Sequence, residues 1–154
     1  MVFGLDFDEA LKLLSALPDF SRRVIANRDE LSRLTAESAK GNRFGIISGS
    51  RYALVTTGAG GIATASLQPL LDQAVNNSNS LSIDYIHGED ELFRLACDSG
   101  AANGSPVTGI LLPPVQKDGF FETVARCGPL PRKSFSMGEA EEKRFYIECR
   151  KLFG

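Results

Sequence analysis

Apolar residues at helical spacing predict two helices at the start of the chain. Leu11, Leu14 and Leu17 recur at intervals of three, and Asp6 or Asp8 can cap the first turn. A second helix is predicted over residues 19–40, where Val24, Leu31 and Leu34 lie along one side. Residues 1–42 therefore form a predicted helical lead-in. An amphipathic start of this kind indicates that the chain is the C-terminal part of a longer protein.

The pattern changes after residue 42 to one that is typical of strands. Residues 43–48 and 51–57 are apolar runs on either side of Gly49 and Ser50, the pair that a type II′ hairpin turn prefers. These runs predict an antiparallel hairpin.

Helices and strands are then expected to alternate along the chain. The expected order is helix 66–75, strand 81–86, helix 89–97, strand 107–112 and helix 117–127. Such alternation predicts a sheet in which neighbouring strands are parallel and are joined by right-handed crossovers. In residues 143–151, Phe145, Ile147 and Cys149 alternate with polar residues, which predicts an edge strand.

The predicted fold class is therefore α/β (α+β). It consists of a mixed sheet of about five strands with an N-terminal antiparallel hairpin, flanked by helices. Residues 43–154 form the mixed α/β domain, in one structural unit with the lead-in.

Composition and charge narrow the class of partner. The chain has 154 residues, of which 43% are hydrophobic and 23% charged, as in an ordinary globular domain. Its formal charge of -2 argues against nucleic acid as a partner. The acidic first ten residues do not resemble a signal peptide, and no run of about 18 apolar residues occurs. We therefore expect a cytoplasmic protein with no membrane partner.

The three cysteines, Cys97, Cys127 and Cys149, are odd in number and form no C-x-x-C pair. This usage argues against a disulfide framework and against a zinc site, so free thiols are expected. The sequence indicates no metal site and leaves any cofactor open.

A glycine-rich segment, residues 58–63, matches G-x-G-x-x-A between a predicted strand and a predicted helix. Asp84 lies at about the distance of a ribose-binding acid in a dinucleotide fold. However, the preceding strand belongs to the hairpin and Pro69 weakens the following helix. A connecting loop is the favoured interpretation.

Two further places carry candidate chemistry. His87, the one histidine, follows a predicted strand, where ligand crevices of α/β sheets form, and is a candidate acid or base. The alternative is a turn histidine bonded to backbone. Arg132, Lys133, Ser134 and Ser136 lie in a proline-braced loop that could bind a phosphate or carboxylate. The alternative there is a solvated loop.

Three segments of the chain resemble the domain of unknown function 1015 family. They are Tyr-Ile-His-Gly at 85–88, Leu-Leu-Pro-Pro-Val at 111–115 and Leu-Pro-Arg-Lys-Ser-Phe-Ser-Met-Gly-Glu-Ala at 130–140. The resemblance covers about residues 43–153. Pro131, Lys133 and Ser134 follow the family pattern, whereas residues 135–140 depart from it.

Members of that family are much longer, so the resemblance implies that a missing N-terminal half supplies part of any active site. They are often encoded beside enzymes of serine biosynthesis, and their N-terminal half is distantly similar to ParB and sulfiredoxin-like proteins, which include free-serine kinases. The resemblance therefore favours phosphoserine or nucleotide chemistry without supplying a reaction.

Two hypotheses of function follow. In the first, the domain is part of a small-metabolite enzyme, linked to serine metabolism, in which Arg132 and Lys133 neutralise an anionic metabolite. Ser134 then orients the metabolite and His87 handles a proton. In the alternative, the domain is a non-catalytic structural module that docks the N-terminal half and forms a homo-oligomer.

Overall fold

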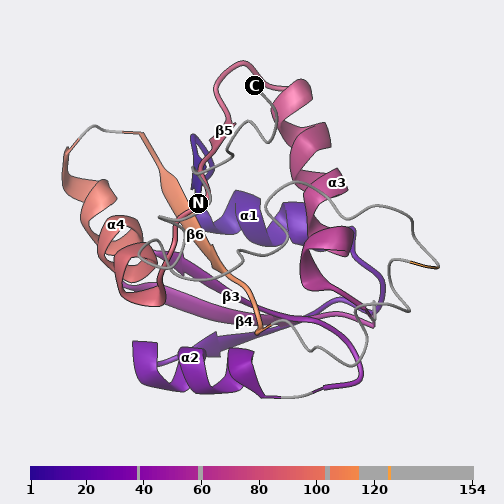
Figure 1. Cartoon of the computed structure of the whole chain (residues 1–154). Coiled ribbons are helices and arrows are strands. Elements are labelled where there is room, and N and C mark those ends of the chain that lie inside the picture. The colour runs from indigo at the N-terminus through magenta and orange to yellow at the C-terminus, as the bar shows by residue number, and fades with distance from the viewer. Residues whose placement is uncertain (38, 59–60, 103–104, 115–124, 126–154) are drawn as a thin grey trace, which may run out of the picture.

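The protein is described from a computed structural model that covers residues 1–37, 39–58, 61–102, 105–114 and 125 (Figure 1). In chain order these residues form β1 (Val2–Phe3), α1 (Phe7–Leu14), β2 (Ser21–Ile25), α2 (Arg28–Ala36), β3 (Arg43–Ser48), β4 (Arg51–Thr56), α3 (Ala63–Asn76), β5 (Ser82–Ile83), α4 (Glu89–Ala102) and β6 (Val107–Leu111). The predicted α/β class, with a sheet flanked by helices, is confirmed. The predicted helix 117–127 and strand 143–151 lie outside the described residues, apart from residue 125.

The sheet has six strands in the order β2-β4-β3-β6-β1-β5, against about five predicted. Every pairing in the described part of the chain is antiparallel, so the prediction of parallel neighbours is wrong. The reason is that β3 and β1 are each inserted between two strands that run in the same direction. β4 and β6 run in the same direction, but β3 lies between them, and β1 likewise lies between β6 and β5.

The predicted hairpin is confirmed by β3 and β4, whose register runs from Arg43 opposite Thr56 to Ser48 opposite Arg51. Gly49 has a φ of 57°, the sign that the first central residue of a type II′ turn requires. Local turn chemistry is therefore enough to specify this part of the fold.

The first helix is confirmed in shortened form, but the second was predicted incorrectly. Asp6 caps α1 by accepting a hydrogen bond from the Glu9 N–H, 2.8 Å away. The predicted helix 19–40 is instead strand β2 followed by α2. Asp19 turns the chain with a φ of 49°, β2 then pairs with β4, and Val24 is 80% exposed. Residues 1–42 are therefore more than a helical lead-in, because they supply two strands of the sheet.

The later elements follow the predicted order with different bounds. α3 and α4 are longer than predicted, and α3 contains Pro69. β5 is reduced to two residues, because only Ser82 and Ile83 pair with β1.

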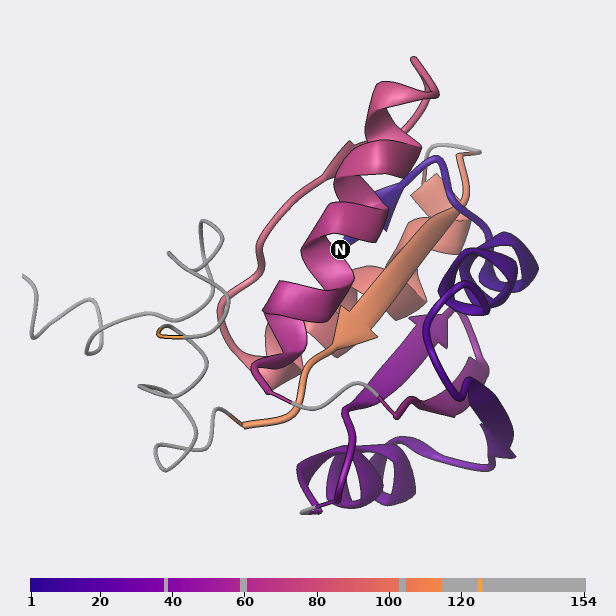
Figure 2. The same cartoon turned by 90° about the vertical axis from the view of Figure 1, so that its right-hand side faces the viewer.

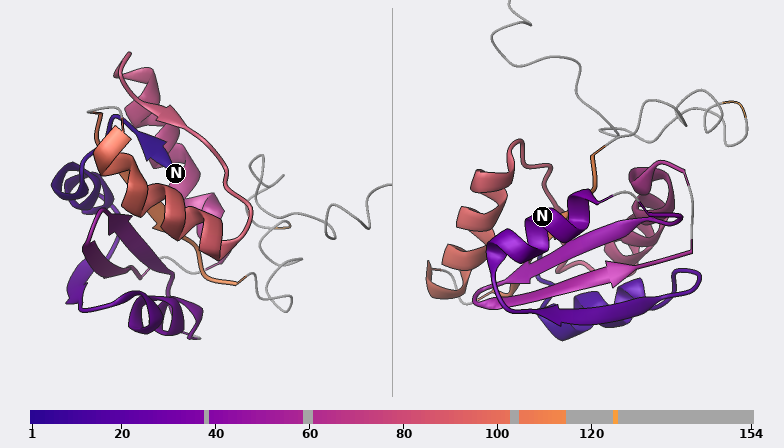
Figure 3. Two further views of the ribbon diagram at one scale, coloured as in Figure 1. Left: turned by 90° about the vertical axis from the view of Figure 1, so that its left-hand side faces the viewer. Right: turned by 90° about the horizontal axis from the view of Figure 1, so that it is seen from below.

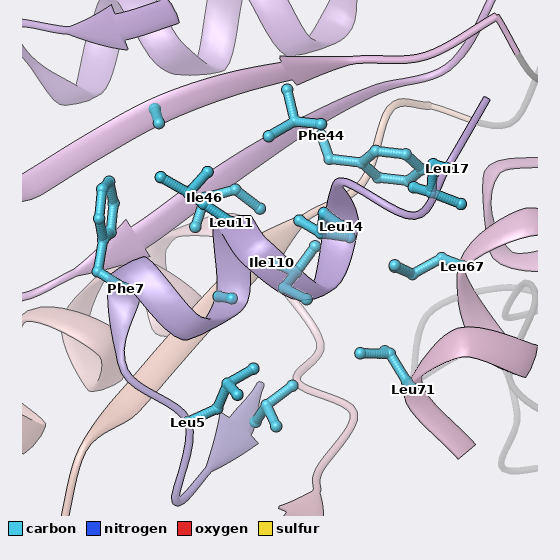
Figure 4. Close-up of a cluster of buried hydrophobic side chains, with 14 of the residues drawn as sticks. Leu5, Phe7, Leu11, Leu14, Leu17, Phe44, Ile46, Leu67, Leu71 and Ile110 are labelled. Carbon is cyan, nitrogen blue, oxygen red and sulfur yellow. The ribbon is translucent and has the colours of Figure 1, made fainter. Parts of the chain in front are cut away.

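Helices cover both faces of the sheet (Figures 2 and 3). α1 and α3 pack on one face, and Figure 4 shows the core there, in which the following side chains converge: Leu11, Leu14, Phe44, Ile46, Leu67, Leu71 and Ile110. α2 and α4 pack on the other face through Leu31, Leu34, Leu92, Phe93 and Ala96. This arrangement leaves the β1–β5 end of the sheet between α3 and α4.

Candidate functional site

A cavity of about 280 Å³ lies at this end of the sheet. It is lined by α3, by the segment from Ile83 to the start of α4, and by the end of β6. The exposed lining residues, here called the rim, are Asp84, Tyr85, Gly88, Glu89 and Leu112. Its volume is near the lower end for ligand pockets, so a metabolite bound here would be small.

The cavity brings together two of the segments that resemble family motifs. Tyr85, Ile86 and Gly88 come from the first segment, and Leu111 and Leu112 come from the second. These residues are more than twenty positions apart in the sequence. Their meeting at one cavity could not be foreseen from spacing alone.

His87 is exposed and lies between two lining residues, Ile86 and Gly88. Gly88 has a φ of 90°, a conformation that glycine adopts without strain. The structure therefore places His87 beside the rim. Arg132, Lys133, Ser134 and Ser136 lie outside the described residues, so their distance from His87 stays untested.

The acidic part of the rim is fixed by contacts with α2. Ser32 donates a hydrogen bond to the Glu89 carboxylate, and Arg28 pairs with Asp90. The hydrogen bond that Arg28 donates to the Asp90 carboxylate raises the pKa of Arg28, whose guanidinium also lies 4.5 Å from the centre of the Phe93 ring. These contacts hold the first turn of α4, where acids also favour the helix dipole.

Two buried polar residues on α3 were missed from the sequence. Thr64 and Gln68 are 6% and 9% exposed and line the cavity, one helical turn apart. The Gln68 amide donates to Asp72 at 2.7 Å, whereas the Thr64 hydroxyl is buried without a hydrogen-bond partner. Their spacing on the same helix face as Leu67 and Leu71 was the available clue.

The glycine-rich segment has little in common with a dinucleotide site. β4 lies between β2 and β3 and is antiparallel to both, unlike the parallel strand of a dinucleotide fold. Ile62 precedes α3 without a side-chain cap, and the Gly58 N–H donates to the Pro18 carbonyl at 2.9 Å. Residues 59 and 60 lie outside the described residues. The geometry therefore favours a connecting loop.

Cys97 is a free thiol, as predicted, while Cys127 and Cys149 lie outside the described residues. The sulfur of Cys97 lies 3.7 Å from the Tyr52 hydroxyl, and this hydrogen bond raises the pKa of Tyr52. Within the described ranges, no group of three or more His, Cys, Asp or Glu side chains could hold a metal ion. In the same part of the chain, no helix is both long and apolar enough to cross a membrane.

The fold and site together define an α/β domain with an antiparallel sheet, helices on both faces and a cavity at one end. Comparison with protein-family models, with curated proteins and with solved structures finds no match. The resemblance to the domain of unknown function 1015 family therefore stays a prediction based on the three motifs.

Proposed function

We propose that this domain is the C-terminal part of a small-metabolite enzyme, of the domain of unknown function 1015 family, and that its anion site lies at the rim. The observation that carries the proposal is the meeting of two motif-bearing segments at one cavity. The third segment follows them in sequence and carries Arg132, Lys133 and Ser134.

The charges at the rim favour a metabolite with both an anion and an ammonium group. Asp84 and Glu89 are carboxylates that would attract an ammonium, and neither suits a bare phosphate. Arg132 and Lys133 would neutralise the phosphate or carboxylate. Phosphoserine combines these groups, in agreement with the serine chemistry that the resemblance implies. His87, beside the rim, would exchange a proton with it.

Calorimetric titration of phosphoserine, serine and inorganic phosphate into the protein tests this proposal. Charge-assisted hydrogen bonds contribute about 1.5–3 kcal/mol each, so replacing Lys133→Ala together with Ser134→Ala should weaken phosphoserine binding at least ~10-fold. Lys12→Ala, an exposed substitution on α1, is the matched control and should leave the affinity unchanged. Lower thermal stability of the double variant with unchanged affinity would contradict the anion site.

The alternative function, a non-catalytic module that docks the N-terminal half, is favoured by a separate observation. The cavity is lined by the end of β6, by residues 83–86 and by the apolar side chains of Leu67, Leu71 and Leu92. A docked segment and a metabolite at the rim are compatible, because the rim is the outer part of the same cavity.

A further inference from the structure

The interior of the cavity differs chemically from the rim. Buried aliphatic side chains from several elements form its walls: Val2, Leu67, Leu71, Leu92 and Ile110. Figure 4 shows Leu67 and Leu71 pointing from α3 toward Ile110. Among the described residues, the carboxylates of the lining, Asp84 and Glu89, belong to the exposed rim. A molecule that entered the interior would therefore exchange water for mainly aliphatic contacts.

The cavity is large enough for a compound of modest size. Its volume is about 280 Å³, whereas an apolar cavity of about 150 Å³ already binds benzene. In proportion, the cavity has room for roughly ten non-hydrogen atoms. The lining residues of α3 run from Thr64 to Leu71, which is about 10 Å along the helix axis. A ring with a short substituent fits this length.

A hydroxyl group in the wall of the cavity is available to such a compound. Thr64 is 6% exposed, and its hydroxyl has no hydrogen-bond partner in the described part of the chain. Thr35 and Thr57 carry buried hydroxyls of the same kind, but neither residue lines the cavity. Buried polar groups in proteins are almost always hydrogen-bonded. A polar group of a ligand in the cavity would supply the partner that Thr64 lacks.

Gln68 provides a second polar group beside Thr64, since residues four apart are neighbours on a helix surface. Its amide nitrogen donates to the Asp72 carboxylate at 2.7 Å. An ionised carboxylate only accepts, so the amide oxygen of Gln68 faces away from Asp72 and is left as an acceptor. A hydroxyl group both donates and accepts, and it therefore suits Gln68 and Thr64 together.

The charges of the lining argue against an anion in the interior. In the described part of the chain, no Lys or Arg side chain lines the cavity, and the Met1 amino group donates to the Asp84 carbonyl at 2.6 Å. An anion among the leucines would be desolvated without a counter-charge. An uncharged ligand avoids this cost.

We propose that the interior of the cavity binds a small uncharged molecule with an apolar body and one hydroxyl group. The ligand hydroxyl would accept a hydrogen bond from Thr64 and donate one to Gln68, while the apolar body packs against Leu67, Leu71 and Ile110. The inference goes beyond the proposed function and does not depend on it. Phosphoserine has no apolar body and would occupy the rim, so the interior ligand would be a different compound.

The test is an NMR titration of the protein with benzyl alcohol and with toluene, which has the same ring without the hydroxyl. We expect both probes to shift the methyl resonances of Leu67, Leu71 and Ile110. Thr64→Val keeps the shape of the side chain and removes its hydroxyl, so it should weaken benzyl alcohol binding about 2–10-fold. The affinity for toluene should stay the same or rise. Comparing variants cancels the different hydration of the two probes.

The matched control is Thr57→Val, which removes an equally buried hydroxyl outside the cavity and should change neither affinity. Thr64→Ser keeps the hydroxyl and should retain most of the affinity for benzyl alcohol. Absence of methyl shifts with both probes would overturn the inference, as would an equal effect of Thr64→Val on the two probes. Because neither probe carries an anion, failure here leaves the phosphoserine titration as an independent test of the anion site.

Discussion

The packing of α4 on β6 depends on the absence of a side chain at Gly109. A Cβ built there would lie 2.9 Å from the Ala96 Cβ and 3.3 Å from the Leu92 Cδ1. Ala96 is 1% exposed and Leu92 is 6% exposed, so neither can move aside into solvent. Overpacking of a core costs roughly 1–3 kcal/mol, whereas Gly→Ala recovers about 0.4–1 kcal/mol from the unfolded chain. We expect Gly109→Ala to lower the free energy of unfolding by about 1–2 kcal/mol.

A second substitution distinguishes this clash from a general intolerance of alanine. Ala96→Gly removes the methyl group that the new Cβ would meet, and alone should cost about 2 kcal/mol through helix propensity and lost burial. The double variant should be no less stable than Ala96→Gly alone, which corresponds to a coupling of about 1–2 kcal/mol. Urea denaturation of the four proteins measures these values. Additive losses would refute the packing argument.

Three further predictions concern single contacts. The Arg51 guanidinium donates two hydrogen bonds of 2.8 Å to Asp8 and lowers the pKa of that carboxyl, so Arg51→Met should raise it in an NMR titration. Because the pKa of Asp8 is lower in the folded than in the unfolded chain, any stabilisation by this pair is present above about pH 4 and is lost as the pH falls through the folded-state pKa. An unchanged Asp8 pKa in the Arg51→Met variant would contradict the contact. Cys97→Ala should lower the pKa of Tyr52 by removing its hydrogen-bond partner, as followed by NMR, whereas a constant value would assign the shift to burial. Thr64→Val should leave stability unchanged or raise it by about 1 kcal/mol, because the buried hydroxyl has no partner; a clear loss in urea denaturation would show that it has one.

The fold could be predicted from the sequence where local chemistry determines it. The β3–β4 hairpin depends on Gly49, and the start of α1 depends on the Asp6 cap, so both were recognised. The strand β2 was missed because its residues pair at a sheet edge and Val24 is exposed, which leaves no apolar period to recognise. Tertiary pairing, rather than helix propensity, determines the structure of that segment.

The sheet order and the site depend on contacts between distant parts of the chain. The alternation of residues 58–112 predicted parallel neighbouring strands, and this was wrong because β1 and β3 lie between the strands that run in the same direction. His87 was expected directly after a strand over residues 81–86, whereas β5 ends at Ile83 and His87 lies between two residues that line the cavity. Thr64 and Gln68 share a helix face with Leu67 and Leu71, but polar residues at this spacing become notable only once that face is known to be buried.

The first 42 residues shape the cavity through their contacts with Asp84 and with the start of α4. Met1 holds Asp84 on one side of residues 85–88, while Ser32 and Arg28 of α2 hold the start of α4 on the other. The segment with His87 is thus fixed at both of its ends.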